Sequence, residues 1–152
     1  MAPDTVEILL VEDDPRDVRL TLGALENMRL VNKVHVARDG EEALDLLFCR
    51  GPHSGRSAQH PRLVLLDLKL PKVNGLEVLR EIKSHPETQA IPVVMLTSSG
   101  EEKDMLESYK LGVNSYIQKP LDFDQFRDTI RTLGFYWLVV NRPPPDEAFS
   151  SQ

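Results

Sequence analysis

Acidic residues stand at two places in this chain where they could do chemistry together. Glu12, Asp13 and Asp14 directly follow a short apolar run, and Asp67 lies within another. Clustered carboxylates repel one another, and a hard divalent cation such as Mg²⁺ relieves that repulsion by binding their oxygens. A carboxylate can also be the nucleophile in phosphoryl transfer and form an aspartyl phosphate. The acids therefore point to metal-assisted phosphoryl chemistry, whereas Asp14 is better explained as a helix cap.

A hydroxyl and an ammonium occupy comparable positions later in the chain. Thr97 ends a third apolar run, and Lys119 follows a fourth. Thr97 can donate a hydrogen bond to phosphoryl oxygens, and Lys119 can balance their charge. Each of these residues alone is common in proteins. Their combination with the acids is what indicates a single site.

The elements that must position these residues alternate along the whole chain. Apolar runs predict strands at 6–11, 33–38, 63–68, 92–97 and 114–118. Amphipathic stretches predict helices at 15–28, 39–48, 76–85 and 101–112, the last of these opened by Ser98, Ser99 and Gly100, and a final helix from Asp122 or Asp124 to about Val140. Such connections form right-handed crossovers, so we expect a parallel sheet covered on both faces. The aliphatic first, third and fourth strands favour a flavodoxin-like, doubly wound (βα)5 α/β fold with strand order 2-1-3-4-5.

This fold would bring the candidate residues together. The carboxyl ends of parallel strands meet at one edge of the sheet, where ligands bind near the switch point in strand order. Neighbouring strands are only about 4.8 Å apart, so groups that follow the first, third and fourth strands can converge.

The composition is that of an ordinary globular domain and excludes several classes of protein. With 152 residues, 41% of them hydrophobic, we expect one domain over 1–142 and a proline-rich flexible tail over 143–152. The net charge of −6 argues against nucleic-acid binding. The single cysteine, the acidic N-terminus and the lack of a membrane-length apolar run predict a cytoplasmic protein without membrane association.

The segment 50–62 is rich in glycine, proline, serine and histidine and predicts a long loop. It contains His53 and His60, whereas His35 and His85 lie elsewhere. A metal site in this loop is conceivable, but a solvated loop fits the pattern better.

Four motifs together resemble the receiver domain of bacterial two-component response regulators. They are ILLVEDDP (8–15), LVLLDLKLPKVNG (63–75), PVVMLTSS (92–99) and YIQKP (116–120). The resemblance implies that Asp67 accepts a phosphoryl group from a sensor histidine kinase. It also implies Mg²⁺ (or Mn²⁺), bound by Asp13, Asp67 and the backbone carbonyl of Lys69, with Glu12 contributing through a water.

The same resemblance assigns roles in the conformational switch. It makes Thr97 and Lys119 the phosphate-binding pair and Tyr116 the aromatic switch residue, and it implies a cis peptide bond before Pro120. Lys69 and Ser99 occupy positions that tune dephosphorylation. The long cationic side chain of Lys69 could shield the phosphoryl group from water, and Ser99 lacks the carboxylate or amide that could orient a hydrolytic water. Both features predict slow self-dephosphorylation.

The ending FYWLVVNRPPP (135–145) and the run 108–126 are similar to the stand-alone regulators of bacterial and cyanobacterial phytochrome kinases. That similarity implies a bacteriophytochrome as the partner kinase and a homodimer. Four consecutive large apolar residues cover all sides of a helix, so at least one must face outward. The expected dimer or partner surface consists of Phe135, Tyr136, Trp137 and Leu138.

Three other functions are compatible with such a fold. A phosphohydrolase with an aspartyl nucleophile would carry a second Asp at position 69, where this chain has Lys69. A flavin or nucleotide carrier needs free backbone donors after the first strand, where EDDP presents anions. A phosphorylation-independent adaptor stays open. The leading hypothesis is a phosphoacceptor, not a dedicated enzyme, that signals through the face of the fourth helix, fifth strand and fifth helix, without a DNA-binding output domain.

Overall fold

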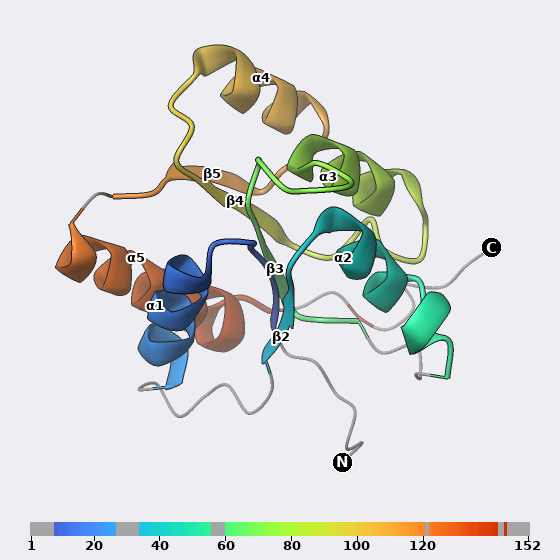
Figure 1. The fold of residues 1–152 in the computed structure, drawn as a ribbon, viewed down its shortest axis with the longest axis horizontal. Coiled ribbons are helices and arrows are strands. Elements are labelled where there is room, and N and C mark those ends of the chain that lie inside the picture. Colours follow the sequence, from blue (N-terminus) through green and yellow to red (C-terminus); the bar gives the residue numbers. More distant parts are fainter. Residues whose placement is uncertain (1–7, 27–33, 56–59, 121, 143–144, 146–152) are drawn as a thin grey trace.

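The computed structural model describes the chain except for residues 1–7, 27–33, 56–59, 121, 143–144 and 146–152. Five strands alternate with five helices (Figure 1). The strands are β1 (Ile8–Val11), β2 (Val34–Ala37), β3 (Leu63–Leu66), β4 (Val93–Thr97) and β5 (Ser115–Gln118). The α-helices are α1 (Pro15–Glu26), α2 (Gly40–Leu47), α3 (Gly75–Ser84), α4 (Glu102–Lys110) and α5 (Phe123–Phe135). A 3₁₀ turn η1 (Gly51–His53) follows α2, and a π-helical turn η2 (Tyr136–Val140) follows α5.

The strands form one parallel sheet in the order β2-β1-β3-β4-β5, which confirms the predicted fold class. Val11 at the end of β1 pairs with Leu66 at the end of β3, and Leu66 pairs with Met95 in β4. The residues that follow these strands therefore come out beside one another at the carboxyl edge of the sheet.

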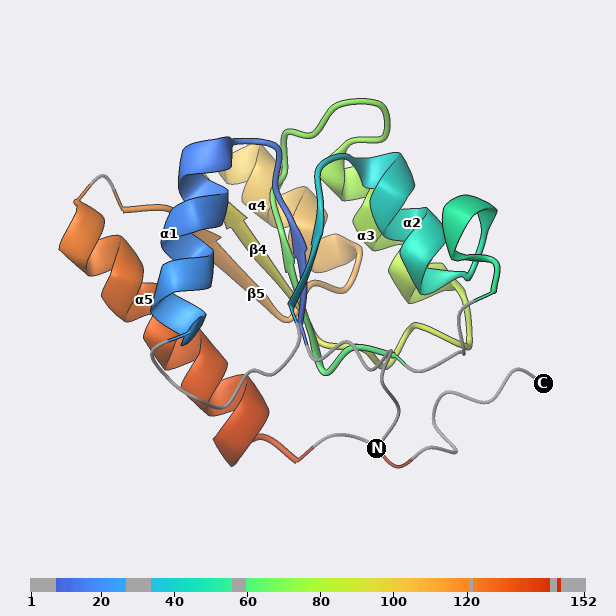
Figure 2. The ribbon, with the colours of Figure 1, turned by 60° about the horizontal axis from the view of Figure 1, so that its bottom comes forward.

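Helices cover both faces of the sheet. In Figures 1 and 2, α1 and α5 lie together on one side, and α2 and α3 lie on the other. Successive side chains of β1 point to opposite faces of the sheet. Ile8 and Leu10 belong to the apolar cluster under α1 and α5, and Leu9 and Val11 belong to the apolar cluster under α2 and α3. All four residues are buried, which fits a central strand with two covered faces.

Local sequence signals account for most helix ends. The side chains of Asp39, Asn74 and Asp122 cap the N-termini of α2, α3 and α5 by accepting hydrogen bonds from backbone N–H groups. Gly75 allows α3 to start against the loop after β3, because a Cβ there would lie 2.2 Å from the carbonyl oxygen of Asp67.

Two predicted helix boundaries differ from the structure. Helix α4 begins at Glu102, one residue after the predicted start, because the Ser99 hydroxyl accepts from Glu101 N–H and forms a turn before the helix. Helix α5 ends at Phe135, and the next turn widens to a π-helix that ends at Val140. The predicted boundary at 142 and the tail fall largely outside the described residues. Within the described part of the chain, no helix is long and apolar enough to cross a membrane.

Candidate functional site

Three of the predicted acids meet at the carboxyl edge of the sheet. Each of Glu12, Asp13 and Asp67 offers a carboxylate oxygen within 4.8 Å of the others. Glu12 and Asp67 are buried and Asp13 is exposed. The pairing of β1 with β3 explains this arrangement, since Asp67 N–H also donates to the carbonyl of Val11. Side chains from two distant segments therefore form one acidic site, as the sequence predicts.

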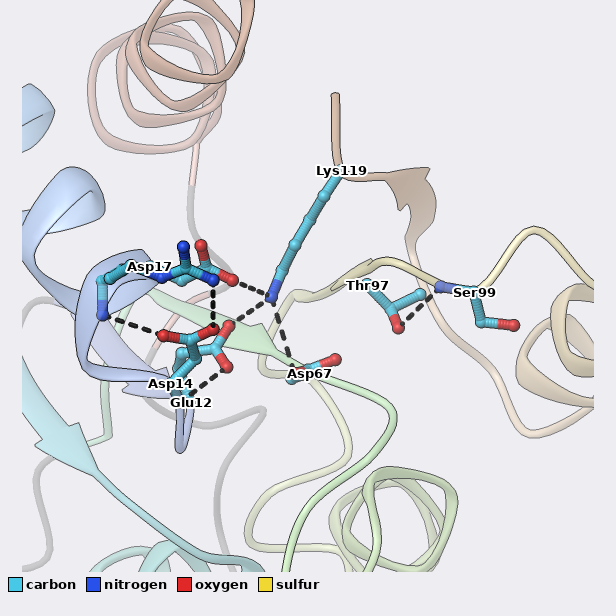
Figure 3. A network of polar contacts seen from close by, with 8 residues as sticks. Glu12, Asp14, Asp17, Asp67, Thr97, Ser99 and Lys119 are labelled. Carbon is cyan, nitrogen blue, oxygen red and sulfur yellow. Dashed lines mark hydrogen bonds and ion pairs between the residues drawn. The ribbon is translucent and has the colours of Figure 1, made fainter. Parts of the chain in front are cut away.

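Lys119 provides the positive charge of the site (Figure 3). Its Nζ lies 2.5 Å from Glu12 Oε1, 2.8 Å from Asp17 Oδ2 and 3.5 Å from Asp67 Oδ2. Only 10% of its side chain is exposed. Lys119 N–H donates to the carbonyl of Thr97, which fixes the residue at the end of β5. One ammonium is thus shared by three carboxylates.

The buried charges change each other's ionisation. Burial raises the pKa of Glu12 to about 7, against the lowering effect of its hydrogen bond from Lys119. Burial alone would lower the pKa of Lys119, but hydrogen bonds to Asp17 and Glu12 and the charge of Asp67 raise it above its ordinary value. Lys119 therefore stays protonated at neutral pH and balances the acids.

The acidic group fits a hard divalent cation. Its donors are carboxylate oxygens, and Mg²⁺ prefers oxygen ligands together with several waters. Both oxygens of Glu12 already have partners, Lys119 Nζ and the N–H of Asp14, which suits contact with a metal through a water. The exposed Asp13 lines a cavity that Lys69 also borders. Asp13 and Asp67 are the side chains placed to bind such an ion directly.

The predicted switch residues lie on the neighbouring strands. Thr97 is fully buried at the end of β4, and its Oγ1 accepts from Ser99 N–H at 3.3 Å. Ser99 Oγ donates to Asp104 Oδ2 at 2.7 Å, which ties the loop after β4 to α4. The hydroxyl of Tyr116 donates to the carbonyl of Ser99 at 3.0 Å. The loop between β4 and α4 is thus held at Ser99, by Asp104 from α4 and by Tyr116 from β5.

The predicted cis peptide bond before Pro120 is wrong. The described part of the chain contains no cis peptide bond. The trans form is the intrinsically preferred one even before proline, by about 0.5–1 kcal/mol. With this bond trans, Lys119 still reaches Glu12 and Asp17, so the observed site does not require the cis form.

The predicted partner surface is only partly exposed. Phe135 and Tyr136 are 53% and 47% exposed, whereas Trp137 packs against the apolar cluster under α1 and α5. Tyr136 and Trp137 rings meet edge to face, with centroids 5.0 Å apart. The side chain of Leu138 is not among those that the structure describes. Among the residues of this set whose side chains the structure describes, Phe135 and Tyr136 are therefore the two available to a partner.

Asp17 is a residue of this site that was not predicted from the sequence. It belongs to the first turn of α1 and contributes the second hydrogen bond to Lys119. An acid in the first turn of a helix is usually explained by the helix dipole, so the sequence held no separate signal for this role. Asp17, Asp67 and Lys119 line one open cleft together with Ser98 and Phe123.

Comparisons with known proteins identify the family of the chain. Residues 8–131 match the response regulator receiver domain. The chain is 43% identical over 143 residues to a probable methanogenesis regulatory protein, FilR2, of Methanothrix harundinacea, covering 94% of this chain and 90% of that protein. It is 39% identical over 131 residues to the response regulator Rcp1 of Synechocystis sp., covering 86% and 88%.

Solved structures give the same result. The bacteriophytochrome response regulator AtBRR is 54% identical, with 92% of this chain and 100% of that chain covered and a TM-score of 0.71. The phosphorylated cyanobacterial phytochrome response regulator RcpA is 41% identical, with 93% and 100% covered and a TM-score of 0.87. The Mn²⁺-bound form of Rcp1 is 38% identical, with 91% and 98% covered and a TM-score of 0.85. With its parallel sheet, its acidic edge and its buried lysine, this chain belongs to the response regulator receiver family.

Proposed function

We propose that this protein is a phosphorylation-controlled response regulator in which Asp67 accepts the phosphoryl group. The observation that carries the proposal is the position of the Asp67 carboxylate. It lies in the open cleft, 3.5 Å from Lys119 Nζ, and offers an oxygen within 4.8 Å of carboxylate oxygens of Glu12 and Asp13. A nucleophile, a permanent cation and a set of metal ligands are the parts that phosphoryl transfer to a carboxylate needs.

The transfer follows from these groups. An Asp67 oxygen attacks the phosphorus of a phosphohistidine on the kinase, the P–N bond breaks, and the imidazole leaves with that electron pair and takes up a proton. When bound, Mg²⁺ would screen the electrostatic repulsion between the negatively charged phosphoryl group and the carboxylates of the site. Lys119 moves from Asp17 toward a phosphoryl oxygen, and the Thr97 hydroxyl donates to another.

The output surface we propose is the face of α4, β5 and α5. Movement of Thr97 toward the phosphoryl group pulls on Ser99, whose N–H donates to Thr97 Oγ1 and whose carbonyl accepts from Tyr116. Tyr116 then turns inward. This face already exposes apolar side chains on α4, since Leu106 and Tyr109 are 55% and 50% exposed. Phosphorylation would thereby change the conformation of the face that α4, β5 and α5 form.

The partner we propose is a sensor histidine kinase of the bacteriophytochrome type. The names of AtBRR and RcpA support it, because those similar proteins are phytochrome response regulators. We also propose a homodimer that uses the exposed Phe135 and Tyr136, and no contact with nucleic acid or membrane. The protein acts as a cytoplasmic signalling component with one receiver domain over 1–142 and not as a dedicated enzyme.

The test is the intact mass after incubation with acetyl phosphate and Mg²⁺. The wild type should gain one phosphoryl group, and Asp67→Asn should gain none. Asp14→Asn is the matched control, since Asp14 is an acid that lines the same cleft but accepts from Arg16 N–H and pairs with the Arg16 guanidinium. Size-exclusion chromatography with light scattering on the same samples measures the oligomeric state. A wild type left unmodified by acetyl phosphate and by a phosphorylated phytochrome kinase would overturn the proposal in favour of an adaptor.

A further inference from the structure

We propose a second metal site, formed by His35, Glu42 and His53, that binds a transition-metal ion such as Zn²⁺. The three residues each offer a ligand atom, and these atoms lie within 4.8 Å of one another. None of them belongs to the phosphoryl-transfer site. They come from three successive elements, β2, α2 and η1, at the edge of the sheet opposite β5 (Figure 1).

The pattern of β2 directs His35 toward this site. Val34 and Val36 pack against the apolar cluster under α1 and α5, so the alternation of the strand turns His35 and Ala37 toward the face covered by α2. Helix α2 begins at Gly40, directly after the strand. A side chain in its first turn can therefore reach back to His35.

Glu42 is held in the orientation that a ligand needs. Its backbone N–H donates to the capping side chain of Asp39 at 2.8 Å. Its Oε1 accepts from Arg38 N–H at 3.0 Å, which leaves Oε2 facing His35. Hydrogen bonds that fix a carboxylate in this way are typical of the groups around metal ligands.

The distance between His35 and Glu42 suits a shared ion better than a hydrogen bond. His35 Nε2 is buried and has no hydrogen-bond partner, although Glu42 Oε2 lies 3.6 Å away. Two ligands at about 2.1 Å from a tetrahedral ion lie about 3.4 Å apart. A small rotation of either side chain therefore accommodates the ion, whereas the present separation is too long for a good hydrogen bond.

The turn after α2 brings in the third ligand. Cys49 and Gly51 have φ values of 53° and 55°, and this left-handed backbone reverses the chain so that η1 returns toward β2. The ring of His53 meets the ring of His35 edge to face, with centroids 5.3 Å apart. The long loop that the sequence predicts as solvated thus places one of its histidines beside the sheet.

The donor set determines the class of metal. Two imidazole nitrogens and one carboxylate oxygen match Zn²⁺, which takes three such ligands and leaves a fourth position for water. The acidic site around Asp67 offers oxygen donors only and favours Mg²⁺. The two sites therefore select different metals, and Zn²⁺ would pin η1 to the edge of the sheet.

The test is calorimetric titration of the metal-free protein with ZnCl₂ in a buffer containing excess MgCl₂, which saturates the acidic site. We expect one Zn²⁺ per chain for the wild type, and affinity at least about tenfold weaker for His53→Gln and for Glu42→Gln. His85→Gln is the matched control, because His85 also lies near a glutamate, 3.7 Å from Glu81, and belongs to no such three-residue group among the described residues. Its affinity should equal that of the wild type.

Circular dichroism and the melting temperature establish that each variant is folded before it is titrated. Cobalt(II) absorption gives a second readout, since imidazole and carboxylate ligation produces a visible spectrum that His53→Gln should lose. Two outcomes would overturn the proposal. One is the absence of stoichiometric Zn²⁺ binding by the wild type, which would leave His35 and Glu42 as an ordinary pair. The other is equal weakening in His53→Gln and His85→Gln, which would indicate scattered surface binding.

Discussion

Asp17 and Asp67 share one cation, because Lys119 Nζ lies 2.8 Å from Asp17 Oδ2 and 3.5 Å from Asp67 Oδ2. The nearer acid is not the proposed phosphoacceptor. In the proposed transfer, Lys119 gives up its contact with Asp17 to bind the phosphoryl group on Asp67, so we expect Asp17 to oppose the activated state.

We expect Asp17→Asn to accelerate phosphorylation by acetyl phosphate. The amide keeps the shape of the side chain but binds the ammonium less strongly than a carboxylate does. A gain of threefold to tenfold in rate corresponds to about 0.6 to 1.4 kcal/mol in the barrier. The rate is measured from the intact mass over time, with Asp14→Asn as the control. A slower reaction would instead make Asp17 a residue that positions Lys119 for the transfer.

The acids and the lysine were predictable because each follows a strand, and a parallel sheet gathers such residues at one edge. Asp17 was not, since a single acid in a first helical turn is usually explained by the helix dipole. The start of α4 was predicted to within one residue, but the hydrogen bond that the Tyr116 hydroxyl donates to the carbonyl of Ser99 was not, because it joins residues 17 positions apart. The approach of His53 to His35 was missed for a similar reason, as it depends on two left-handed residues in the intervening turn.

Mg²⁺ should stabilise the fold through Asp13. A ligand that binds only the folded state adds RT ln(1 + [L]/Kd), which is about 1.4 kcal/mol at ten times Kd. Asp13 is the exposed member of the acidic group, so Asp13→Asn leaves the buried contacts of Lys119 intact. We expect the melting temperature of the wild type to rise with added MgCl₂ and that of Asp13→Asn to change much less. An equal rise in both proteins would place the ion elsewhere.

Lys69 should protect the phosphoryl group from water. Its side chain is exposed two residues after Asp67 and beside the cavity that Asp13 lines. We expect the wild type to lose its phosphoryl group slowly, over minutes or longer, and Lys69→Asn to lose it severalfold faster. Lys72→Asn is the control, because Lys72 is an exposed lysine of the same loop whose φ of 66° an asparagine tolerates. A wild-type half-life of seconds would contradict the expected protection.

The hydroxyl of Tyr116 should hold the loop after β4 in its present conformation. Tyr116→Phe removes the hydrogen bond to the carbonyl of Ser99 and keeps the ring that packs on the core. We expect faster hydrogen–deuterium exchange in residues 98–102 of the unphosphorylated protein, with phosphorylation of Asp67 retained. Tyr109→Phe, which alters an exposed tyrosine of α4, should leave the exchange unchanged. Unchanged exchange in Tyr116→Phe would mean that Ser99 and Asp104 alone hold the loop.

Lys83 should make stability depend on pH in the alkaline range. Its Nζ donates to the carbonyls of Gln89 and Ile91 and to Asn114 Oδ1, at 3.1, 2.7 and 3.3 Å. Burial lowers the pKa of Lys83 to about 8, below its ordinary value of 10.5. Between these two values the unfolded chain holds a proton that the folded protein has released, so the free energy of unfolding rises with pH in this window.

Lys83→Met tests this effect because it keeps the aliphatic stem and removes the titrating amine. At pH 7 we expect the variant to be less stable by about 1–3 kcal/mol, since three acceptors lose their donor. From pH 8 to 10.5 the free energy of unfolding of the wild type should rise relative to that of the variant. The rise should be less than about 1.4 kcal/mol per pH unit, which is the limit for one proton. Denaturant unfolding at several pH values measures the difference, with the exposed Lys103→Met as the control. A difference between wild type and Lys83→Met that stays constant across this range would show that Lys83 titrates at its ordinary pKa, with its three hydrogen bonds offsetting the cost of burial.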